Sequence, residues 1–134
     1  MSEPKVVMTS GVFDLLHRGH LNFLWRSKQL GDILVVGVVS DTGVLEYKSR
    51  FPEWTQDYRV KMIRDLSFVD SVLVQRSTDP SPLLRAWRPD IFTHGDDWDE
   101  LLEGAETLAE LGVVYTPLPY TEGISTTLLR SHYG

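Results

Sequence analysis

Short apolar runs rich in β-branched residues alternate with longer segments in which apolar residues recur at helical spacing. Five of these runs predict strands, at 6–9, 33–39, 71–75, 91–94 and 113–116. The run at 33–39 is apolar at every position except Gly37, which is typical of a central parallel strand buried on both faces. Strands that alternate with helices indicate a parallel sheet with crossover helices, so the pattern predicts an α/β fold.

The segments between the strands predict helices. The first, at 19–30, would turn Leu21, Leu24 and Trp25 toward the sheet. Thr55 would cap a second helix that continues to residue 66, with an acidic residue in its first turn. The remaining helices are expected at 80–87, at 99–111 with Gly112 as the C-cap, and at about 125–132.

A loop is expected over 43–53, at the carboxyl end of the second strand, because this segment holds a turn-prone glycine, two basic residues and Pro52. No repeat or low-complexity tract interrupts the alternation of strands and helices. The sequence therefore predicts a single Rossmann-like domain over 1–134, with a five-stranded parallel sheet and helices on both faces.

Ligands of open parallel sheets bind at the carboxyl ends of the strands, near the point where the strand order reverses. Four of the five predicted strand ends carry unusual side chains, in the segments 9–11, 43–53, 94–97 and 120–127. We expect these four segments to converge on one site.

The first of these ends leads into the string Gly-Val-Phe-Asp-Leu-Leu-His-Arg-Gly-His at residues 11–20. His17 and His20 would lie at the start of a helix, where backbone N–H groups favour an anion, and Gly19 would let a ligand approach closely. Imidazole N–H groups directed at a phosphate stabilise the charge that develops during nucleotidyl transfer. A helix cap beside a surface histidine, or a metal site with Asp14 as third ligand, are the alternatives; the preceding strand and the glycines favour phosphate binding.

This string resembles the HxGH signature of the nucleotidyltransferase superfamily, which includes cytidylyltransferases, pantetheine-phosphate adenylyltransferases and ADP-heptose synthases. Three further segments resemble glycerol-3-phosphate cytidylyltransferase in order and spacing over nearly the whole chain. They are Lys28-Gln29-Leu30-Gly31-Asp32, Gly95-Asp96-Asp97-Trp98 and Thr121-Glu122-Gly123-Ile124-Ser125-Thr126-Thr127. The last string is the most specific and points to the cytidylyltransferase branch.

The resemblance implies roles for individual residues. His17 and His20 would hold the α-phosphate and the departing pyrophosphate, Lys48 would neutralise developing charge, and Asp14 and Lys48 would contact the acceptor. The residues expected to contact the nucleotide are Gly11, Val12, Phe13, Gly19, Arg50, Arg59, Gly95, Asp96, Asp97, Trp98, Tyr120, Thr121, Gly123, Ile124, Ser125, Thr126 and Thr127. No metal site made of protein ligands is expected; Mg²⁺ would accompany the nucleotide, bound largely through its phosphates.

Several of these residues can also be explained without a role in ligand binding. Exposed cations such as Lys48 and Arg50 commonly serve no specific purpose, and Arg59 is equally well explained as a surface residue of a helix. Asp96 or Asp97 can cap the following helix. His94 has no counterpart in the resemblance and is interpreted as structural, with ligand contact as the alternative.

The sequence departs from the cytidylyltransferase pattern at four positions. Tyr120 stands where an arginine introduces the Thr-Glu-Gly string, and Val12 stands where a threonine is usual. Ser67 and Ser81 occupy positions near which an arginine and a lysine are expected. Because one of the missing cations would hold glycerol phosphate, these changes weaken the assignment of the acceptor more than that of nucleotidyl transfer.

Composition and charge limit the kinds of ligand and partner that the chain is expected to bind. The formal net charge is −6, which disfavours binding to nucleic acid or to an anionic membrane. Twelve of the 13 basic residues lie within positions 1–88, so the cations able to hold an anionic ligand belong to this part. The chain has no cysteine, which excludes a disulfide scaffold and a thiol nucleophile. With no signal peptide evident and no apolar run longer than Ile33–Val39, a cytoplasmic protein is expected, and the resemblance implies a homodimer.

The sequence therefore predicts a cytidylyltransferase that converts CTP and a small phosphorylated acceptor, similar to glycerol 3-phosphate, into a CDP-linked product and pyrophosphate. One alternative is an adenylyltransferase similar to ADP-heptose synthase or FAD synthetase. The other is a non-catalytic regulatory protein that binds nucleotides, suggested by the missing cations.

Overall fold

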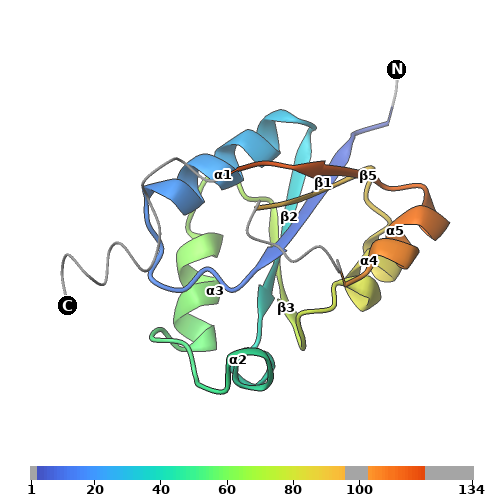
Figure 1. Ribbon diagram of the computed structural model, residues 1–134. Helices are drawn as coiled ribbons and strands as arrows, with labels where there is room; N and C mark the ends of the chain where they lie inside the picture. The colour runs from blue at the N-terminus through green and yellow to red at the C-terminus, as the bar shows by residue number, and fades with distance from the viewer. Residues whose placement is uncertain (1–2, 96–102, 120–134) are drawn as a thin grey trace.

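The computed structural model describes residues 3–95 and 103–119, which form a five-stranded parallel sheet with helices packed on both faces (Figure 1). The elements are β1 (Val6–Gly11), α1 (Arg18–Gln29), β2 (Ile33–Val39), α2 (Asp41–Lys48), α3 (Gln56–Arg64), β3 (Ser71–Gln75), α4 (Ser81–Trp87), β4 (Ile91–His94), α5 (Ala105–Leu111) and β5 (Val114–Pro117). The predicted α/β, Rossmann-like fold is confirmed.

The strand order is β3-β2-β1-β4-β5, and every neighbouring pair is parallel. From β1 the chain builds first toward β2 and β3 and later toward β4 and β5. The strand order therefore reverses between β1 and β4, where open α/β sheets bind ligands at the carboxyl ends.

Two apolar cores lie on opposite faces of the sheet. Phe23 of α1 and Ile63 of α3 pack with Val7 on one face. Leu84 of α4 and Leu108 of α5 pack with the adjacent Met8 and other strand residues on the other face. Each large side chain fully buried in this way stabilises the fold by roughly 1.5–3 kcal/mol, so α1 and α3 are fixed on one face while α4 and α5 are fixed on the other (Figure 1).

The amino ends of the strands are held by aspartates that accept hydrogen bonds from backbone N–H groups. Asp32 accepts from Lys5 N at 2.8 Å, and Asp90 accepts from Val6 N at 2.8 Å. Asp70 accepts from the backbone N–H of β2 residue Leu34 at 2.8 Å. These carboxylates serve the sheet itself and lie at the edge opposite the predicted ligand site.

The predicted loop over 43–53 is wrong, because its first part is the helix α2. The side chain of Ser40 accepts from Gly43 N at 3.0 Å and caps this helix. A Cβ at Gly43 would lie 2.7 Å from the carbonyl oxygen of Arg76, so this glycine allows the helix to pack closely rather than the chain to turn. Lys48 is consequently the last residue of a helix, followed by Ser49 in the left-handed conformation at φ 60°.

The inward stripe of α1 also differs from the prediction. Leu24 is buried and Leu21 is half-buried, as expected. Trp25, however, is 49% exposed, and its ring packs edge-to-face on that of Phe68. Phe23 is buried instead. The helical spacing allowed either aromatic side chain to face the sheet.

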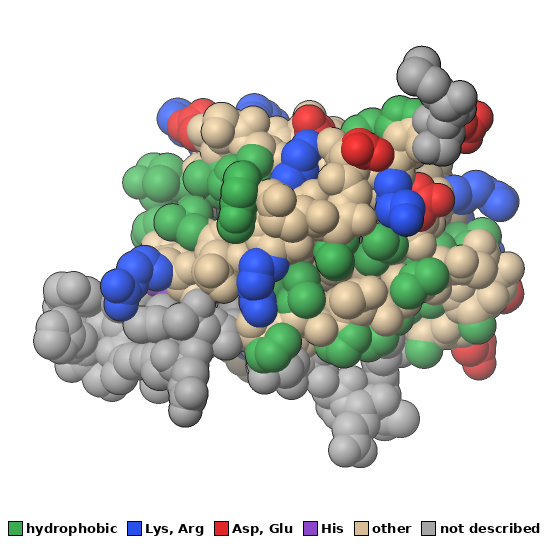
Figure 2. Space-filling model, turned by 90° about the horizontal axis from the view of Figure 1, so that it is seen from above, with side chains coloured by type: hydrophobic (Ala, Val, Ile, Leu, Met, Phe, Trp, Pro, Cys, Tyr) green, Lys and Arg blue, Asp and Glu red, His purple; other side chains and the backbone are tan. Residues whose placement is uncertain are grey.

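The remaining boundaries, apart from the start of α5, agree within one or two residues where they can be compared. Thr55 caps α3, and Gly112 ends α5 at φ 67°. The helix predicted over 99–111 begins later than expected, because residues 103–104 form a turn and α5 starts at Ala105, after Gly104 at φ 90°. Residues 99–102 and the predicted helix at 125–132 fall outside the described residues. Within the described ranges, no helix has the length and apolar character needed to cross a membrane. On the face that Figure 2 shows, the basic and acidic side chains are interspersed rather than gathered by sign.

Candidate active site

Two histidines lie at the start of α1, beside the carboxyl end of β1. His17 is the N-cap: its Nδ1 accepts from Gly19 N at 3.0 Å, while its own backbone N–H donates to Nδ1 of His20 at 3.1 Å. The two imidazole rings lie 4.0 Å apart, centroid to centroid. These reciprocal bonds form a capping box in which both partners are imidazoles, so the spacing of the pair is fixed by the helix start.

The capping bonds also fix where each imidazole carries its proton. An Nδ1 that accepts a hydrogen bond is unprotonated, so the proton of each neutral ring lies on Nε2. Burial lowers the pKa of His17, and burial followed by the charge of His17 lowers the pKa of His20 to about 3. At neutral pH the site therefore holds two uncharged imidazoles whose Nε2–H groups are hydrogen-bond donors, at the end of a helix that favours negative charge.

Phe13 packs between the turn after β1 and the histidines. Its ring is 3% exposed and meets the ring of His20 edge-on, with centroids 5.8 Å apart. A Cβ at Gly11 would lie 3.0 Å from two atoms of the same ring, which explains the glycine at the end of β1. The backbone φ values of Phe13 and Leu15 are 55° and 50°, a conformation that costs a residue with a side chain about 1–2 kcal/mol. Such strained residues cluster at functional sites.

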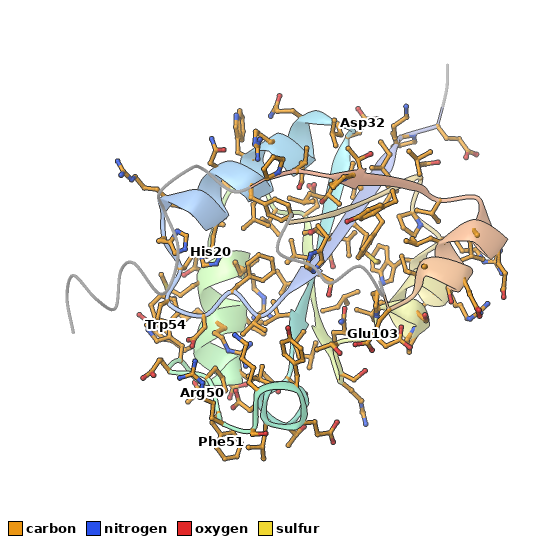
Figure 3. The ribbon with its side chains drawn as sticks, viewed as in Figure 1. His20, Asp32, Arg50, Phe51, Trp54 and Glu103 are labelled. Carbon is orange, nitrogen blue, oxygen red and sulfur yellow. The ribbon has the colours of Figure 1, made fainter. Side chains whose placement is uncertain are left out.

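Asp14, between these two strained residues, joins the β1–α1 loop to the segment that leads into α3. Its carboxylate accepts from Glu53 N at 2.7 Å and from Trp54 N at 2.8 Å. Figure 3 accordingly shows His20, Trp54 and Arg50 along one side of the molecule. The segment 49–55, which follows Lys48, is thereby brought next to the histidine loop.

Lys48 and Arg50 are both exposed, the first at the end of α2 and the second two residues beyond it. The adjoining segment also exposes the aromatic rings of Tyr47 and Phe51, by 63% and 60%. The two cations are therefore accessible to an anionic ligand from solvent. Their roles toward acceptor and nucleotide stay predictions.

Arg59 is buried, so its interpretation as a surface residue is wrong. Its guanidinium donates to the carbonyl oxygens of Val12 at 2.9 Å, Val39 at 2.6 Å and Trp54 at 3.1 Å, and it pairs with the carboxylate of Asp41 at 2.7 Å. Four segments at the carboxyl edge of the sheet are thus held by one side chain. Nucleotide contact by Arg59 stays a prediction, but the bonds it makes here are to the protein.

His94 ends β4 next to the buried Gly95. Its Nδ1 lies 3.3 Å from the carbonyl oxygen of Gly95, and burial lowers its pKa to about 4. The ring is neutral at physiological pH and belongs to the same edge of the sheet as the histidine pair. The remaining predicted contacts lie outside the described residues: Asp96, Asp97, Trp98, Tyr120, Thr121, Gly123, Ile124, Ser125, Thr126 and Thr127.

The partners that hold the loops at this edge could not be found from the sequence. Asp41, which pairs with Arg59, belongs to no motif. Glu53 and Trp54 bond to Asp14 through their backbone N–H groups, and every residue except proline has such a group, so the residue type does not indicate the contact. Ser10 and Gln75 form a buried hydrogen bond of 2.7 Å between the ends of β1 and β3, across β2. An isolated serine or glutamine at a strand end gives no signal of such a pairing.

No group of three or more His, Cys, Asp or Glu side chains in the described ranges is arranged to hold a metal ion. Asp14, the third ligand in the metal alternative, directs its two carboxylate oxygens to backbone N–H groups. The described donor set therefore does not fit a metal ion held by three protein side chains.

Comparisons with known proteins agree on a family. A family model described as cytidylyltransferase-like matches residues 8–132. The chain is similar to the bifunctional protein HldE of Desulfatibacillum aliphaticivorans, with 40% identity over 126 residues that cover 92% of this chain and 26% of that protein. It is also similar to the bifunctional protein HldE of Helicobacter pylori strain P12, with 36% identity over 131 residues that cover 96% of this chain and 28% of that protein. The chain thus spans about a quarter of the length of these relatives.

Two solved structures share the fold. A lipopolysaccharide core biosynthesis protein from Thermoplasma volcanium superposes with a TM-score of 0.72 and 30% identity, over 89% of this chain and 98% of that one. A pantoate-β-alanine ligase from Francisella tularensis, solved with an ATP compound and β-alanine, superposes with a TM-score of 0.68 over 100% of this chain and 67% of that one. At 12% identity, this second likeness concerns the fold alone.

Proposed function

The chain belongs to the cytidylyltransferase-like family of nucleotidyltransferases, and from this premise we propose that it transfers the adenylyl group of ATP to a phosphorylated sugar. The single observation that carries the proposal is the pair of neutral imidazoles at the start of α1, each with its proton on Nε2. Two uncharged donors side by side at a helix N-terminus suit a phosphate group whose negative charge grows during the reaction.

The relatives support the alternative similar to ADP-heptose synthase, which uses ATP, better than transfer from the CTP expected from the sequence. The two relatives described above are HldE proteins and not glycerol-3-phosphate cytidylyltransferases, and the solved structure at 30% identity is a lipopolysaccharide core biosynthesis protein. They support the adenylyltransferase alternative, and a sugar phosphate as acceptor. The absence of the arginine at position 120 and of the cations at 67 and 81 is consistent with an acceptor other than glycerol 3-phosphate.

The proposed reaction is an in-line displacement at the α-phosphorus. An oxygen of the acceptor phosphate forms a bond to this phosphorus while the bond to the oxygen that bridges to the β-phosphate breaks, and the electron pair leaves with pyrophosphate. No covalent intermediate with the protein and no redox change is involved. Catalysis then rests on position and on the stabilisation of charge.

The described residues have distinct parts in this scheme. His17 and His20 donate from Nε2 to oxygens of the α-phosphate and the departing pyrophosphate. Lys48, with Arg50 beside it, attracts the phosphate of the acceptor from the exposed end of α2. Mg²⁺ keeps several waters and binds nucleotides through their phosphates, so we propose that it enters with ATP as part of the substrate.

Pyrophosphate release tests the proposal. The protein is incubated with each of four nucleoside triphosphates in turn and with sugar 1-phosphates, glycerol 3-phosphate or flavin mononucleotide as acceptor. ATP with a sugar 1-phosphate should give the highest rate. A preference for CTP would reject the adenylyl assignment, and nucleotide binding without turnover for every pair would favour the non-catalytic alternative.

Variants at the site complete the test. His20→Ala should lower the rate by at least ~10²-fold, the scale expected when a donor to the reacting phosphate is lost. Lys61→Gln is the matched control, since Lys61 is exposed on the outer side of α3 and pairs only locally with Asp65 among its described contacts.

The homodimer and the cytoplasmic location stay predictions. Analytical ultracentrifugation can check the first of them.

A further inference from the structure

The β1–α1 loop and the segment before α3 are joined by a closed ring of hydrogen bonds. Asp14 Oδ1 accepts from Trp54 N at 2.8 Å, and the carbonyl oxygen of the same residue, Trp54, accepts from Nε of Arg59 at 3.1 Å. The ring is closed by Nη1 of Arg59, which donates to the carbonyl oxygen of Val12 at 2.9 Å, two residues before Asp14 in the histidine loop. The N–H of Trp54 is therefore held directly by the histidine loop, and its carbonyl oxygen is held by Arg59, which in turn bonds to that loop.

This ring joins two parts of the proposed site that otherwise belong to different elements. On one side, Asp14 is three residues before His17, in a loop whose backbone is strained at Phe13 and Leu15. On the other side, Trp54 lies in the segment 49–55, which follows Lys48 at the end of α2. A carboxylate that accepts two backbone N–H groups, and a guanidinium donating to three carbonyls, hold these segments with charge-assisted bonds.

From this ring we infer that Asp14 and Arg59 are positioning residues, which set the distance between the histidines and the cations at Lys48 and Arg50. This reassigns Asp14 from the acceptor and Arg59 from the nucleotide. The inference rests on the proposed function, because the distance matters only if the two groups act on the two reacting phosphates. An error of about 1 Å in such a distance can cost ~10² in rate.

The reassignment agrees with the burial and charge of both side chains. Arg59 is fully buried, and its positive charge is paired with the carboxylate of Asp41. A nucleotide would have to displace protein partners to reach it. Asp14 carries the same sign of charge as a phosphate, and its two oxygens already accept from the backbone of the neighbouring segment.

Two variants separate a positioning role from ligand binding. Asp14→Asn keeps the shape of the side chain but leaves one acceptor oxygen for two N–H groups, and Arg59→Lys keeps the charge but loses the planar fork. We expect each to lower kcat by about 10–100-fold while the Kd of ATP changes by less than about threefold. Because both residues hold Trp54, the double variant should be no slower than the slower single variant.

Asp90→Asn is the matched control, since Asp90 also accepts a backbone N–H at 2.8 Å but at the amino edge of the sheet. Its kcat should equal that of the wild type even if its thermal stability falls. A KM for the acceptor that rises with kcat unchanged in Asp14→Asn would overturn the inference and assign Asp14 to the acceptor. Losses that multiply in the double variant would also overturn it, because the two residues would then act independently.

Hydrogen exchange keeps the test independent of activity. Exchange at the amide of Trp54 should be at least tenfold faster in Asp14→Asn than in the wild type, and unchanged in Asp90→Asn. If the wild type shows no turnover with any substrate pair, the proposed function fails while faster exchange still supports the ring. Unchanged exchange at Trp54 in both Asp14→Asn and Arg59→Lys would show that the ring does not hold the segment.

Discussion

The neutral state of His20 makes a quantitative prediction about stability. Its pKa is about 3 in the folded protein, whereas an unfolded histidine titrates near 6.5. Between these values the unfolded chain binds more protons than the folded one, so the free energy of unfolding falls as the pH falls. The stabilisation is fully present above pH 6.5. At pH 5 about 2 kcal/mol of it is lost through this one side chain.

The variant His20→Asn removes this titration. The amide oxygen of asparagine can take the place of Nδ1 and accept from the backbone N–H of His17, so the helix cap is retained. Urea unfolding at pH 7 and at pH 5, followed by tryptophan fluorescence, gives the loss for each protein. We expect the loss in His20→Asn to be smaller than that in the wild type by about 2 kcal/mol.

Each protein is compared with itself at two pH values, so a general destabilisation of the variant does not disturb the result. His17 and His94, whose pKa values are also lowered by burial, titrate in both proteins. Lys61→Gln is the control and should lose as much as the wild type. An equal loss in wild type and His20→Asn would mean that burial does not lower the pKa of His20, and would contradict the buried, neutral imidazole proposed at the start of α1.

Three further predictions concern other parts of the site. Gly11→Ala should destabilise the protein by roughly 1–3 kcal/mol and slow turnover, since the added Cβ would force the buried Phe13 ring to move; urea unfolding and pyrophosphate release measure the two effects. Thr55→Ala should cost about 1 kcal/mol in urea unfolding, because it removes the acceptor for Tyr58 N at the start of α3. Tyr120→Arg should tighten nucleotide binding by calorimetry if this position faces phosphate, and an unchanged Kd would remove it from the predicted contacts.

Most of the fold could be predicted from the sequence because hydrophobic burial dictates it. The strand over Ile33–Val39 is apolar on both faces and sits next to the centre of the sheet as expected. The helix α2 could not be predicted in this way. It buries only Gly43 and Val44, so it lacks an apolar stripe, and its glycine resembles a turn signal although it serves a close approach to Arg76.

The site was predictable where side-chain type carries the chemistry and not where the backbone does. The HxGH string located the histidine pair, but not the capping bonds that fix both protons on Nε2. Arg59 gave a misleading signal, since a cation near a phosphate site invites a ligand role while its described bonds are to carbonyls and Asp41. Partners of Arg59 lie at or just after the ends of β1 and β2, and these segments meet only because the two strands are neighbours in the sheet. The strand order is a property of the whole chain and cannot be read from one residue.

The proposed function is adenylyl transfer that depends on the histidine pair. The decisive experiment incubates the wild type and His20→Ala in parallel with ATP labelled at the α-phosphate and with a sugar 1-phosphate. We expect label to appear in a sugar nucleotide with the wild type, and at least ~10²-fold more slowly with His20→Ala. Labelled product formed equally fast by both proteins, or formed from labelled CTP in preference to ATP, would contradict it.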